Sequence, residues 1–449
     1  MMFTNRPAMG KEDSFRGSTA TLNDQNDALD ENWLAVRNEV QKRLLSDNNG
    51  NGKGSQDTSE LMRKSIENTF NEVLVERNLL LSQETRFQLL QYIIDDIVGY
   101  GPLEPLLNNP EITEIMVNGP YDIYVERFGT IDYTPVKFEN EAHLRRIIDR
   151  IVAPIGRRVD ESSPMVDARL PSGYRVNATI PPLSLTGPVV TIRKFAAQPF
   201  TVQELIVNES LTESLVIFLK ACIEARINLV VSGGTGSGKT TLLNLLSSFI
   251  PSKERIITIE DTAELSMHQK HVVRLEKRPP NIEGRGEVTI RQLVINALRM
   301  RPDRIIVGEC RGSEALDMLQ AMNTGHDGSM TTVHSNGPRD ALRRIEVMVL
   351  MAGMELPLKA IREQIASSIE LIVHLERLKD GTRKVVRVSE VQGLEGDTLV
   401  MQDIFLFDQV RIQDGRVVGK LKSTGLRPRF LSKLKSYSID LPDRVFEND

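Results

Sequence analysis

The chain has 449 residues, enough for two or three domains that each have a hydrophobic core. Its formal net charge of −5 argues against general nucleic-acid binding, which usually shows as a basic domain. Two cysteines, Cys222 and Cys310, are too few and too far apart for a disulfide framework or a C-x-x-C zinc site. No apolar stretch approaches the length of about 18 residues that a membrane span needs, and the polar residues 23–32 exclude a signal peptide. These features predict a soluble, cytoplasmic protein.

The N-terminal part is expected to be helical or to lack regular structure. Residues 1–56 are assigned as largely disordered, because the first 28 or so are polar and show no periodicity. The exception is a short amphipathic helix, indicated by the helical spacing of Trp33, Val36, Val40 and Leu44. Residues 57–98 are predicted to be a helical segment, with helices over 58–80 and 83–98 and Ser82 as an N-cap.

Residues 99–198 are predicted to form a small, PAS-like α+β domain. The turns Asn118-Gly119 and Phe128-Gly129 are typical of β-hairpins. One helix is expected over 139–154. The predicted strands are 111–117, 121–127, 130–135, 166–170, 174–180 and 188–194.

Residues 199–449 alternate apolar runs with helices, which is typical of a mostly parallel α/β sheet. The predicted strands are 227–232, 255–260, 271–275, 303–308 and 328–333, and later strands near 371–377, 383–391, 398–406 and 409–413 should add antiparallel pairs. The predicted helices are 211–225, 239–250, 289–301, 313–323, 338–351 and 357–368. The expected fold class is α/β.

A phosphate-binding loop follows the first of these strands. Residues 233–240 match the P-loop pattern G-x-x-x-x-G-K-[ST], with a strand before and a helix after, as the chemistry requires. The nucleotide-binding candidates are Gly233, Gly234, Thr235, Gly236, Ser237, Gly238, Lys239, Thr240 and Thr241. Lys239 is expected to reach the β- and γ-phosphates, and Thr240 to hold Mg²⁺ through its hydroxyl. The sequence therefore predicts binding of a nucleoside triphosphate.

Two further strands end in carboxylates. Strand 255–260 leads into Glu260, Asp261 and Glu264, and strand 303–308 leads into Glu309. Doubly wound sheets bind ligands at the carboxyl ends of their strands, so these side chains are candidates for holding Mg²⁺, partly through water, and for orienting the attacking water. The alternative for the first cluster is a solvated loop after a buried strand.

Two histidines and several arginines complete the candidate set. His326 and His334 flank the predicted strand 328–333. They are interpreted as part of a polar network that senses the γ-phosphate; a metal site with Asp327 lacks the usual spacing, and structural histidines remain the alternative. The α+β domain carries candidates for an arginine finger, which otherwise face water or pair with carboxylates. These are Arg157, Arg158, Arg169, Arg175 and Arg193.

Together the motifs resemble the secretion-superfamily ATPases. The P-loop, TIEDTAEL (258–265), RIIVGECRG (304–312) and TGHDGSMTTVHSN (324–336) resemble the blocks called Walker A, Asp box, Walker B and His box in that family. Further runs are most similar to the CpaF/TadA group of tight-adherence pilus ATPases, among them VGYGPLEPLL (98–107), VDARLPSGYRVNATIPP (166–182) and RPPNIEGRGEVTIRQL (278–293). The likeness extends from about residue 60 to the end and leaves 1–56 outside.

The resemblance implies a RecA-like P-loop domain and an N-terminal domain that clamps the nucleotide, in a homohexameric ring. It implies a Mg-dependent ATPase at the inner face of the inner membrane. Such a motor drives assembly of a type IV or Tad pilus through inner-membrane platform proteins, with retraction left open. The protein would associate with the membrane peripherally, through its partner proteins. It would not bind nucleic acid.

The resemblance also implies roles for single residues. Glu309 looks like the catalytic glutamate, and Glu260, Asp261 and Glu264 look like Asp-box carboxylates for Mg²⁺ and water. His326 and His334 would couple nucleotide state to neighbouring subunits. Arg175 and Arg193, followed by Arg169, would be the best arginine candidates.

Several alternatives stay open. A type IV secretion ATPase that energises macromolecule translocation shares all four motifs, whereas the absence of a tetracysteine module argues against many type II secretion ATPases. A nucleic-acid motor with a RecA-like core is disfavoured by the net charge. A nonhydrolysing nucleotide-gated scaffold is disfavoured by the intact carboxylate set.

Overall fold

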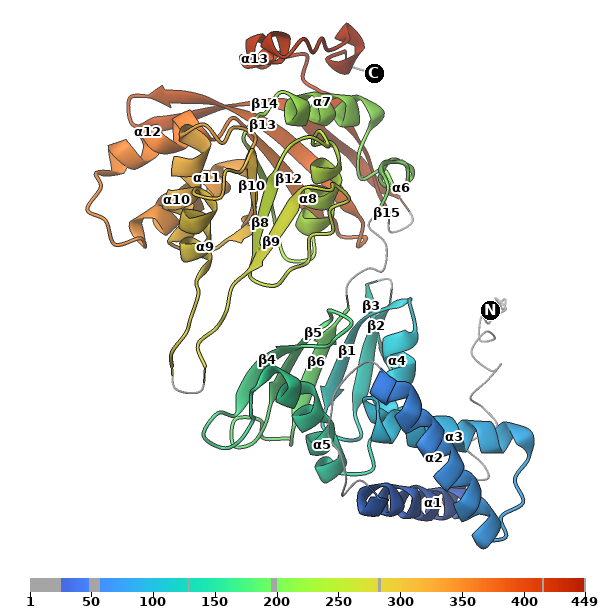
Figure 1. Ribbon diagram of the computed structural model, residues 1–449. Helices are drawn as coiled ribbons and strands as arrows, with labels where there is room; N and C mark the ends of the chain where they lie inside the picture. The colour runs from blue at the N-terminus through green and yellow to red at the C-terminus, as the bar shows by residue number, and fades with distance from the viewer. Residues whose placement is uncertain are drawn as a thin grey trace, which may run out of the picture. The chain divides into compact units, whose positions relative to one another are not determined.

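The computed structural model describes residues 26–47, 57–127, 129–194, 200–281, 284–413 and 416–447. The chain divides into two compact units, an N-terminal unit that ends at Lys194 and a C-terminal unit that begins after it (Figure 1). Within the segment 1–56 that was assigned as largely disordered, residues 1–25 and 48–56 lie outside the described residues. No helix in the described part of the chain is both long and apolar enough to cross a membrane.

Three helices open the N-terminal unit and share one hydrophobic core. They are α1 (Asn26–Asp47), α2 (Asp57–Glu76) and α3 (Gln83–Ile97). The predicted N-cap is confirmed, because the Ser82 hydroxyl accepts a bond from the Thr85 N–H at 3.1 Å. The helix predicted from Trp33 to Leu44 is α1, which has 22 residues and so is not short. Its apolar face is buried against α2 and α3, so this stretch belongs to the folded unit and the assignment of 1–56 as largely disordered is wrong for it.

A six-stranded antiparallel sheet forms the rest of this unit. The strands are β1 (Ile112–Asn118), β2 (Ile123–Arg127), β3 (Thr130–Tyr133), β4 (Met165–Arg169), β5 (Arg175–Thr179) and β6 (Val189–Arg193), in the order β3-β2-β1-β6-β5-β4. Helix α5 (Glu141–Val152) packs one side against the buried face of the sheet, because its apolar residues recur at helical spacing. Shorter turns are η1 (Gly101–Leu103), α4 (Glu104–Asn108) and η2 (Ala153–Ile155).

A buried ionic network joins α1 and α3 to α5 and to the loop that precedes α5. Arg37 on α1, only 4% exposed, contacts Glu139 and lies 3.5 Å from Asp96. His143 on α5 is fully buried, and its Nε2 lies 2.6 Å from Asp96 Oδ1. Burial alone would raise the pKa of Asp96, but the contact with His143 and the charges of His143 and Arg37 outweigh burial and hold that pKa below its ordinary value. The network therefore fixes α1 to the α+β part of the unit.

Removing Arg37 is expected to destabilise the N-terminal unit. In Arg37→Ala, Glu139 loses its arginine partner and Asp96 loses one of its two cationic partners, and breaking a buried pair costs about 3 kcal/mol or more. The single tryptophan, Trp33, packs near Tyr92 in this unit, so denaturant unfolding followed by its fluorescence reports the loss. Arg43→Ala removes an exposed pair with Glu76 from the same helix and should shift the transition much less; equal shifts would contradict the assignment.

The stabilisation by Asp96 should depend on pH. A carboxyl whose pKa is lowered in the folded state stabilises the protein above its unfolded pKa and loses that effect as the pH falls through the folded pKa. Asp96→Asn should therefore be less stable than the parent chain at pH 7, and the difference should shrink towards about pH 3. The Trp33 unfolding midpoint measured across this range tests the prediction; a constant difference would exclude ionisation as its cause.

The C-terminal unit is built on a nine-stranded sheet in the order β15-β14-β13-β12-β7-β11-β10-β8-β9. The parallel strands are β7 (Leu229–Gly233), β8 (Ile256–Glu260), β9 (Val272–Glu276), β10 (Arg304–Cys310), β11 (Met330–His334) and β12 (Leu371–Arg377). Antiparallel pairs then add β13 (Arg383–Glu395), β14 (Thr398–Gln413) and β15 (Arg416–Ser423), as predicted.

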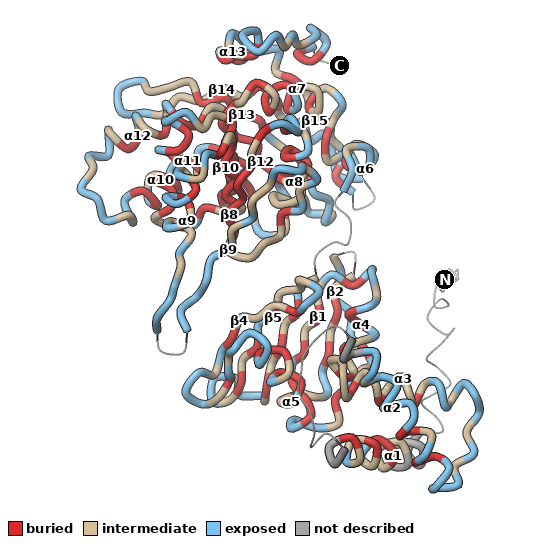
Figure 2. The backbone as a smooth tube through the Cα atoms, in the orientation of Figure 1, coloured by how far each residue is buried: buried red, intermediate tan, exposed pale blue. Residues whose placement is uncertain are grey.

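Helices cover both faces of this sheet. One core holds residues of α7 (Glu213–Glu224) and α8 (Lys239–Ser248), and the other holds residues of α9 (Ile290–Ala297), α10 (Glu314–Asn323), α11 (Pro338–Leu350) and α12 (Leu358–Ser368). Successive residues of a central strand point to opposite faces of the sheet and so belong to different cores. In β7, Leu229 and Val231 belong to the first core and Val230 belongs to the second. Figure 2 shows these strands almost wholly buried.

Some elements differ from the predicted ones. Helix α6 (Val202–Val207) was not predicted, although Thr201 and Glu204 form a capping box that marks its start. Strands predicted over 398–406 and 409–413 are one strand, β14, and β15, α13 (Leu431–Ser436) and η3 (Asp443–Val445) were not predicted. The polar residues at the end of β14 hide its strand character, because both their faces are exposed.

Candidate active site

The P-loop joins β7 to α8 in the way its sequence predicts. Gly236 and Gly238 have φ angles of 68° and 96°, a region that glycine enters without steric cost. Gly238 is the N-cap of α8 and has no side chain with which to cap it, so the first N–H groups of the helix point toward a bound anion. Lys239 Nζ donates to the carbonyls of Gly233 and Gly234 at 3.0 and 2.8 Å. The ammonium thus lies against the phosphate-binding loop.

The other predicted loop residues occupy the same turn. Ser237 is buried, and its hydroxyl donates to the Gly234 carbonyl at 2.9 Å, which closes the loop. Thr235 is exposed at the tip of the loop. Thr240 and Thr241 follow Lys239 in the first turn of α8, where both are half-buried. The loop residues are therefore together, as predicted.

The strand order brings two carboxylates to the edge of the sheet at which the P-loop lies. β8 and β10 are parallel neighbours; Glu260 is the last residue of β8, and Glu309 is the last residue but one of β10. Glu260 is 2% exposed and its Oε2 accepts bonds from the N–H groups of Glu264 and Leu265, at 2.7 and 2.8 Å. Burial raises the pKa of Glu260, and the two backbone bonds oppose that effect. A buried carboxyl at this edge is suited to contact a cation.

Gly308 is required for the close approach of Glu260 to β10. A Cβ at Gly308 would lie 2.9 Å from Glu260 Cγ, so Gly308→Ala should displace that side chain. Misplacing a group of a catalytic site by about 1 Å can lower the rate by on the order of 10²-fold. We expect such a loss of ATP turnover, measured by phosphate release. Gly337→Ala is the control, since its backbone is extended at φ 177° and a Cβ there meets nothing within 4 Å; equal activity of the two variants would contradict the prediction.

Two cations that the sequence did not single out contact the carboxylates. Arg311 donates to Glu309 at 2.7 Å and lies 3.9 Å from Asp261. The hydrogen bond with Glu309 raises the pKa of Arg311. Lys277, which follows β9, pairs with Asp261. Arg311 stands in the Walker B run and Lys277 directly after a strand, but neither position alone indicates a carboxylate partner. Two positively charged side chains thus offset part of the negative charge of the carboxylates in the site.

The carboxylates fit a magnesium ion. Glu260 Oε1 is buried and has no hydrogen-bond partner, which is costly unless a cation or its water approaches. In the described ranges, no three His, Cys, Asp or Glu side chains are grouped so as to hold a metal. That arrangement suits Mg²⁺, which takes few protein ligands and completes its shell with water and substrate phosphates. Thr240, Glu260, Asp261 and Glu309, the predicted ligands, would therefore hold Mg²⁺ partly through water, because no three carboxylates among the described residues are grouped closely enough to bind it directly.

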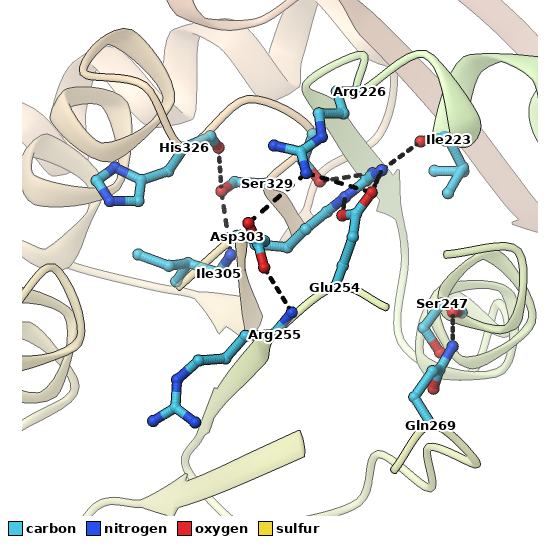
Figure 3. A network of polar contacts seen from close by, with 12 residues as sticks. Ile223, Arg226, Ser247, Glu254, Arg255, Gln269, Asp303, Ile305, His326 and Ser329 are labelled. Atoms are coloured by element: carbon cyan, nitrogen blue, oxygen red, sulfur yellow. Dashed lines mark hydrogen bonds and ion pairs between the residues drawn. The ribbon is translucent and has the colours of Figure 1, made fainter. Parts of the chain in front are cut away.

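The two predicted histidines are on opposite edges of the sheet. His334 ends β11 and pairs in register with Gly233, so it lies beside the P-loop. His326 precedes β11, and its carbonyl accepts a bond from the Ser329 hydroxyl at 2.7 Å (Figure 3). At about 3.3 Å per residue, the strand separates them by about 15 Å. His326 therefore lies at the end of β11 that is remote from the P-loop of its own chain, and the two histidines do not share a metal site.

The three best arginine candidates of the N-terminal unit form one row. Arg169 pairs in register with Arg175, and Arg175 with Arg193, across the neighbouring strands β4, β5 and β6. Directly paired residues share a face of the sheet. That face is opposite to the hydrophobic core, because the alternate residues Val176 and Ile192 are buried in it. The three arginines therefore lie on one face of the sheet.

Comparison with known proteins identifies the family. Residues 96–407 match the family described as "Type II/IV secretion system protein", and residues 33–98 match "Type II secretion system protein E, N-terminal domain". The chain belongs to the type II/IV secretion ATPase family. This secretion ATPase is therefore a P-loop enzyme that binds and hydrolyses ATP, in a family whose members are typically hexameric. The family likeness begins near residue 33, so the expectation that it leaves 1–56 outside is wrong.

The relatives of this secretion ATPase include conjugation and secretion proteins. A putative conjugal transfer protein of Mycobacterium tuberculosis is 34% identical over 68% of this chain and 88% of its own. The type IV secretion system protein VirB11 of Brucella suis is 33% identical over 65% of this chain and 88% of its own. The crystal structure of that VirB11 ATPase, determined in complex with sulphate, matches 64% of this chain and 91% of its own at 32% identity and a TM-score of 0.35. These names correspond to the translocation alternative rather than to the CpaF/TadA pilus group.

Proposed function

We propose that this chain is the Mg²⁺-dependent ATPase subunit of a homohexameric ring that energises macromolecule translocation by a type IV secretion machine. The observation that carries the proposal is that Lys239, Glu260 and Glu309 all lie at the carboxyl-terminal edge of one parallel sheet. The names of the relatives at 33–34% identity support translocation as the work that hydrolysis drives.

The proposed division of labour follows the chemistry of each group. Lys239 and the N–H groups of the P-loop bind the phosphates, while Thr240, Glu260 and Asp261 hold Mg²⁺, partly through water. Bound Mg²⁺ would neutralise charge on the phosphates. Glu309 accepts a proton from the water that attacks the γ-phosphate, and Glu264 helps to position that water. His334, beside the P-loop, senses whether the γ-phosphate is present.

The arginine row supplies the positive charge that the transition state needs. We propose that Arg175 and Arg193, with Arg169 beside them, contact the γ-phosphate, from the same subunit or a neighbour. An arginine delivered to a P-loop site in this way contributes about 10³ to 10⁵ in rate. The register of β4, β5 and β6 supports this proposal, because it gathers the three guanidinium groups on one face.

The first experiment tests hydrolysis itself. The purified full chain should release phosphate from ATP only with Mg²⁺, and Lys239→Ala should abolish nucleotide binding and release. Lys253→Ala removes an exposed lysine elsewhere in the same unit and should keep full activity. Unchanged hydrolysis in Lys239→Ala would refute the assignment of the site.

A tight-adherence pilus motor is the second candidate function. It is supported by the runs at 98–107, 166–182 and 278–293, and it would place the ring on pilus platform proteins at the inner face of the inner membrane. Source cells that carry Lys239→Ala separate the candidates, when scored for macromolecule transfer to recipient cells and for surface pili by electron microscopy. Lost transfer with normal pili supports translocation, and lost pili with normal transfer overturns it in favour of the pilus motor.

A further inference from the structure

The hairpin between β12 and β13 lies beside the P-loop. β12 runs parallel to β7, and Leu375 pairs in register with Gly233. Arg377, two residues further along β12, therefore reaches the edge of the sheet at which the P-loop lies. Arg383 is the cross-strand partner of Arg377 on β13. The fold thus places two arginines beside the P-loop, although they come from a segment some 140 residues later in the sequence. The contact of Arg383 with Gly236 is direct evidence of this placement.

Direct contacts join these arginines to the loop. Arg383 Nε donates to the carbonyl of Gly236 at 2.8 Å. A Cβ built at Gly238 would lie 3.7 Å from Arg383 Cδ, and one at Gly236 would lie 4.0 Å from Arg377 Nη1. Both arginines are exposed, so their guanidinium groups lie at the surface next to the phosphate-binding turn. Arg383 therefore holds the backbone of the P-loop.

The hairpin itself is held in place. Asp380 at its turn accepts bonds from the Thr382 hydroxyl at 2.6 Å and from the Val417 N–H of β15 at 2.8 Å. The Ser210 hydroxyl donates to the carbonyl of Arg383 at 2.7 Å. Lys384 pairs with Glu209 at 2.8 Å. With both ends of the turn fixed, the hairpin is a firm support for the loop.

The charge arrangement indicates an anion. Two like charges directly opposite each other on neighbouring strands destabilise a sheet, and an anion between or beside them relieves that cost. The sheet order places these arginines on the β12 side of β7 and the carboxylates on the β11, β10 and β8 side. The bound nucleotide offers the polyphosphate that would lie at the P-loop between the two groups.

We propose that the β12–β13 hairpin forms a second, cationic wall of the nucleotide site. Arg377 contacts the polyphosphate of the bound nucleotide, and Arg383 is a positioning residue that acts through the Gly236 carbonyl. This inference rests on nucleotide binding at the P-loop and holds for a translocation motor and a pilus motor alike.

The test measures binding of a fluorescent ADP analogue to the full chain, and its displacement by inorganic tripolyphosphate. Arg377→Ala should weaken both by about 10-fold, as expected for one lost charge-assisted hydrogen bond. Arg383→Ala should raise KM for ATP more than it lowers kcat, and Arg383→Lys should recover part of that loss. Lys379→Ala, which removes an exposed charge from the tip of the same hairpin, should bind like the parent chain.

Each result decides the inference. If Arg377→Ala and Arg383→Ala bind both probes as Lys379→Ala does, the hairpin is not part of the site. If Arg377→Ala weakens the analogue but not tripolyphosphate, the contact is to the nucleoside and the phosphate assignment is wrong. Lys239→Ala is measured alongside, because intact binding there would refute the P-loop site itself. Far-UV circular dichroism melting of each variant identifies any that fails to fold, and Arg383→Lys then serves in place of Arg383→Ala.

Discussion

Glu309→Gln is expected to bind ATP like the parent chain and to hydrolyse it 10² to 10⁴ times more slowly, the range for loss of a general base. Glu309 is the last residue but one of β10, the neighbour of the strand that ends in Glu260, and it lies at the carboxyl-terminal edge of the sheet, where the P-loop also lies. The amide keeps the size of the side chain and its bond from Arg311, but it cannot accept the proton of the attacking water. Binding of a fluorescent ATP analogue and the rate of phosphate release separate the two effects.

The control for this variant is a carboxylate remote from the site. Glu355→Gln, in the exposed turn between α11 and α12, makes the same change of charge and should leave both measurements unchanged. Full turnover in Glu309→Gln would contradict the role of Glu309. Loss of nucleotide binding in that variant would instead assign Glu309 to binding.

Local patterns in the sequence predicted the parts of the site that depend on local structure. The P-loop needs only a strand, glycines with positive φ and a helix, and all three are encoded within about 15 residues. The carboxylates that end apolar strands lie at the same edge of the sheet as the P-loop, because parallel strands present all their carboxyl ends there. The register of the three arginines follows from β4, β5 and β6 pairing as neighbours.

Local sequence patterns did not predict the order of the strands in the nine-stranded sheet. Arg377 and Arg383 flank an Asp380-Gly381 turn that marks a hairpin in the sequence, but only the pairing of β12 with β7 puts them next to the P-loop. His326 and His334 lie in one motif, yet a strand runs between them and separates them. The domain limits at 98/99 and 198/199 stay predictions.

The N-terminal helix shows a second reason for such errors. The spacing of Val36, Val40 and Leu44 indicated an amphipathic helix, but not what its apolar face packs against. An arginine is usually expected at the surface, but Arg37 is buried. Its burial depends on Asp96 and Glu139, which are 59 or more positions away in the chain. Long-range ion pairs of this kind have no local signature.

Arg304→Met is expected to lower the free energy of unfolding of the C-terminal unit by about 3 to 5 kcal/mol, the cost of breaking a buried ion pair. Arg304 opens β10 and is fully buried (Figure 3 draws its network). Its guanidinium bonds Glu254 at 2.6 Å and donates to the carbonyl of Ile223 at 2.7 Å. Gly328 adjoins it so closely that a Cβ there would lie 2.5 Å from Arg304 Nη1. This one side chain thus joins α7 to the segments that precede β8, β10 and β11.

A second substitution should restore much of what Arg304→Met loses. Adding Glu254→Leu removes the carboxylate that would otherwise stay buried without its main partner, and apolar replacements of a buried pair are often close to neutral. Arg226 also contacts Glu254, at 3.4 Å. In the double variant Arg226 still has Asp303 as an ion-pair partner, at 3.7 Å. Denaturant unfolding followed by far-UV circular dichroism measures both variants. The Trp33 fluorescence transition should stay unchanged, since Trp33 belongs to the N-terminal unit. A double variant as unstable as Arg304→Met would show that the backbone contacts of Arg304, and not its charge pair, hold the strands together.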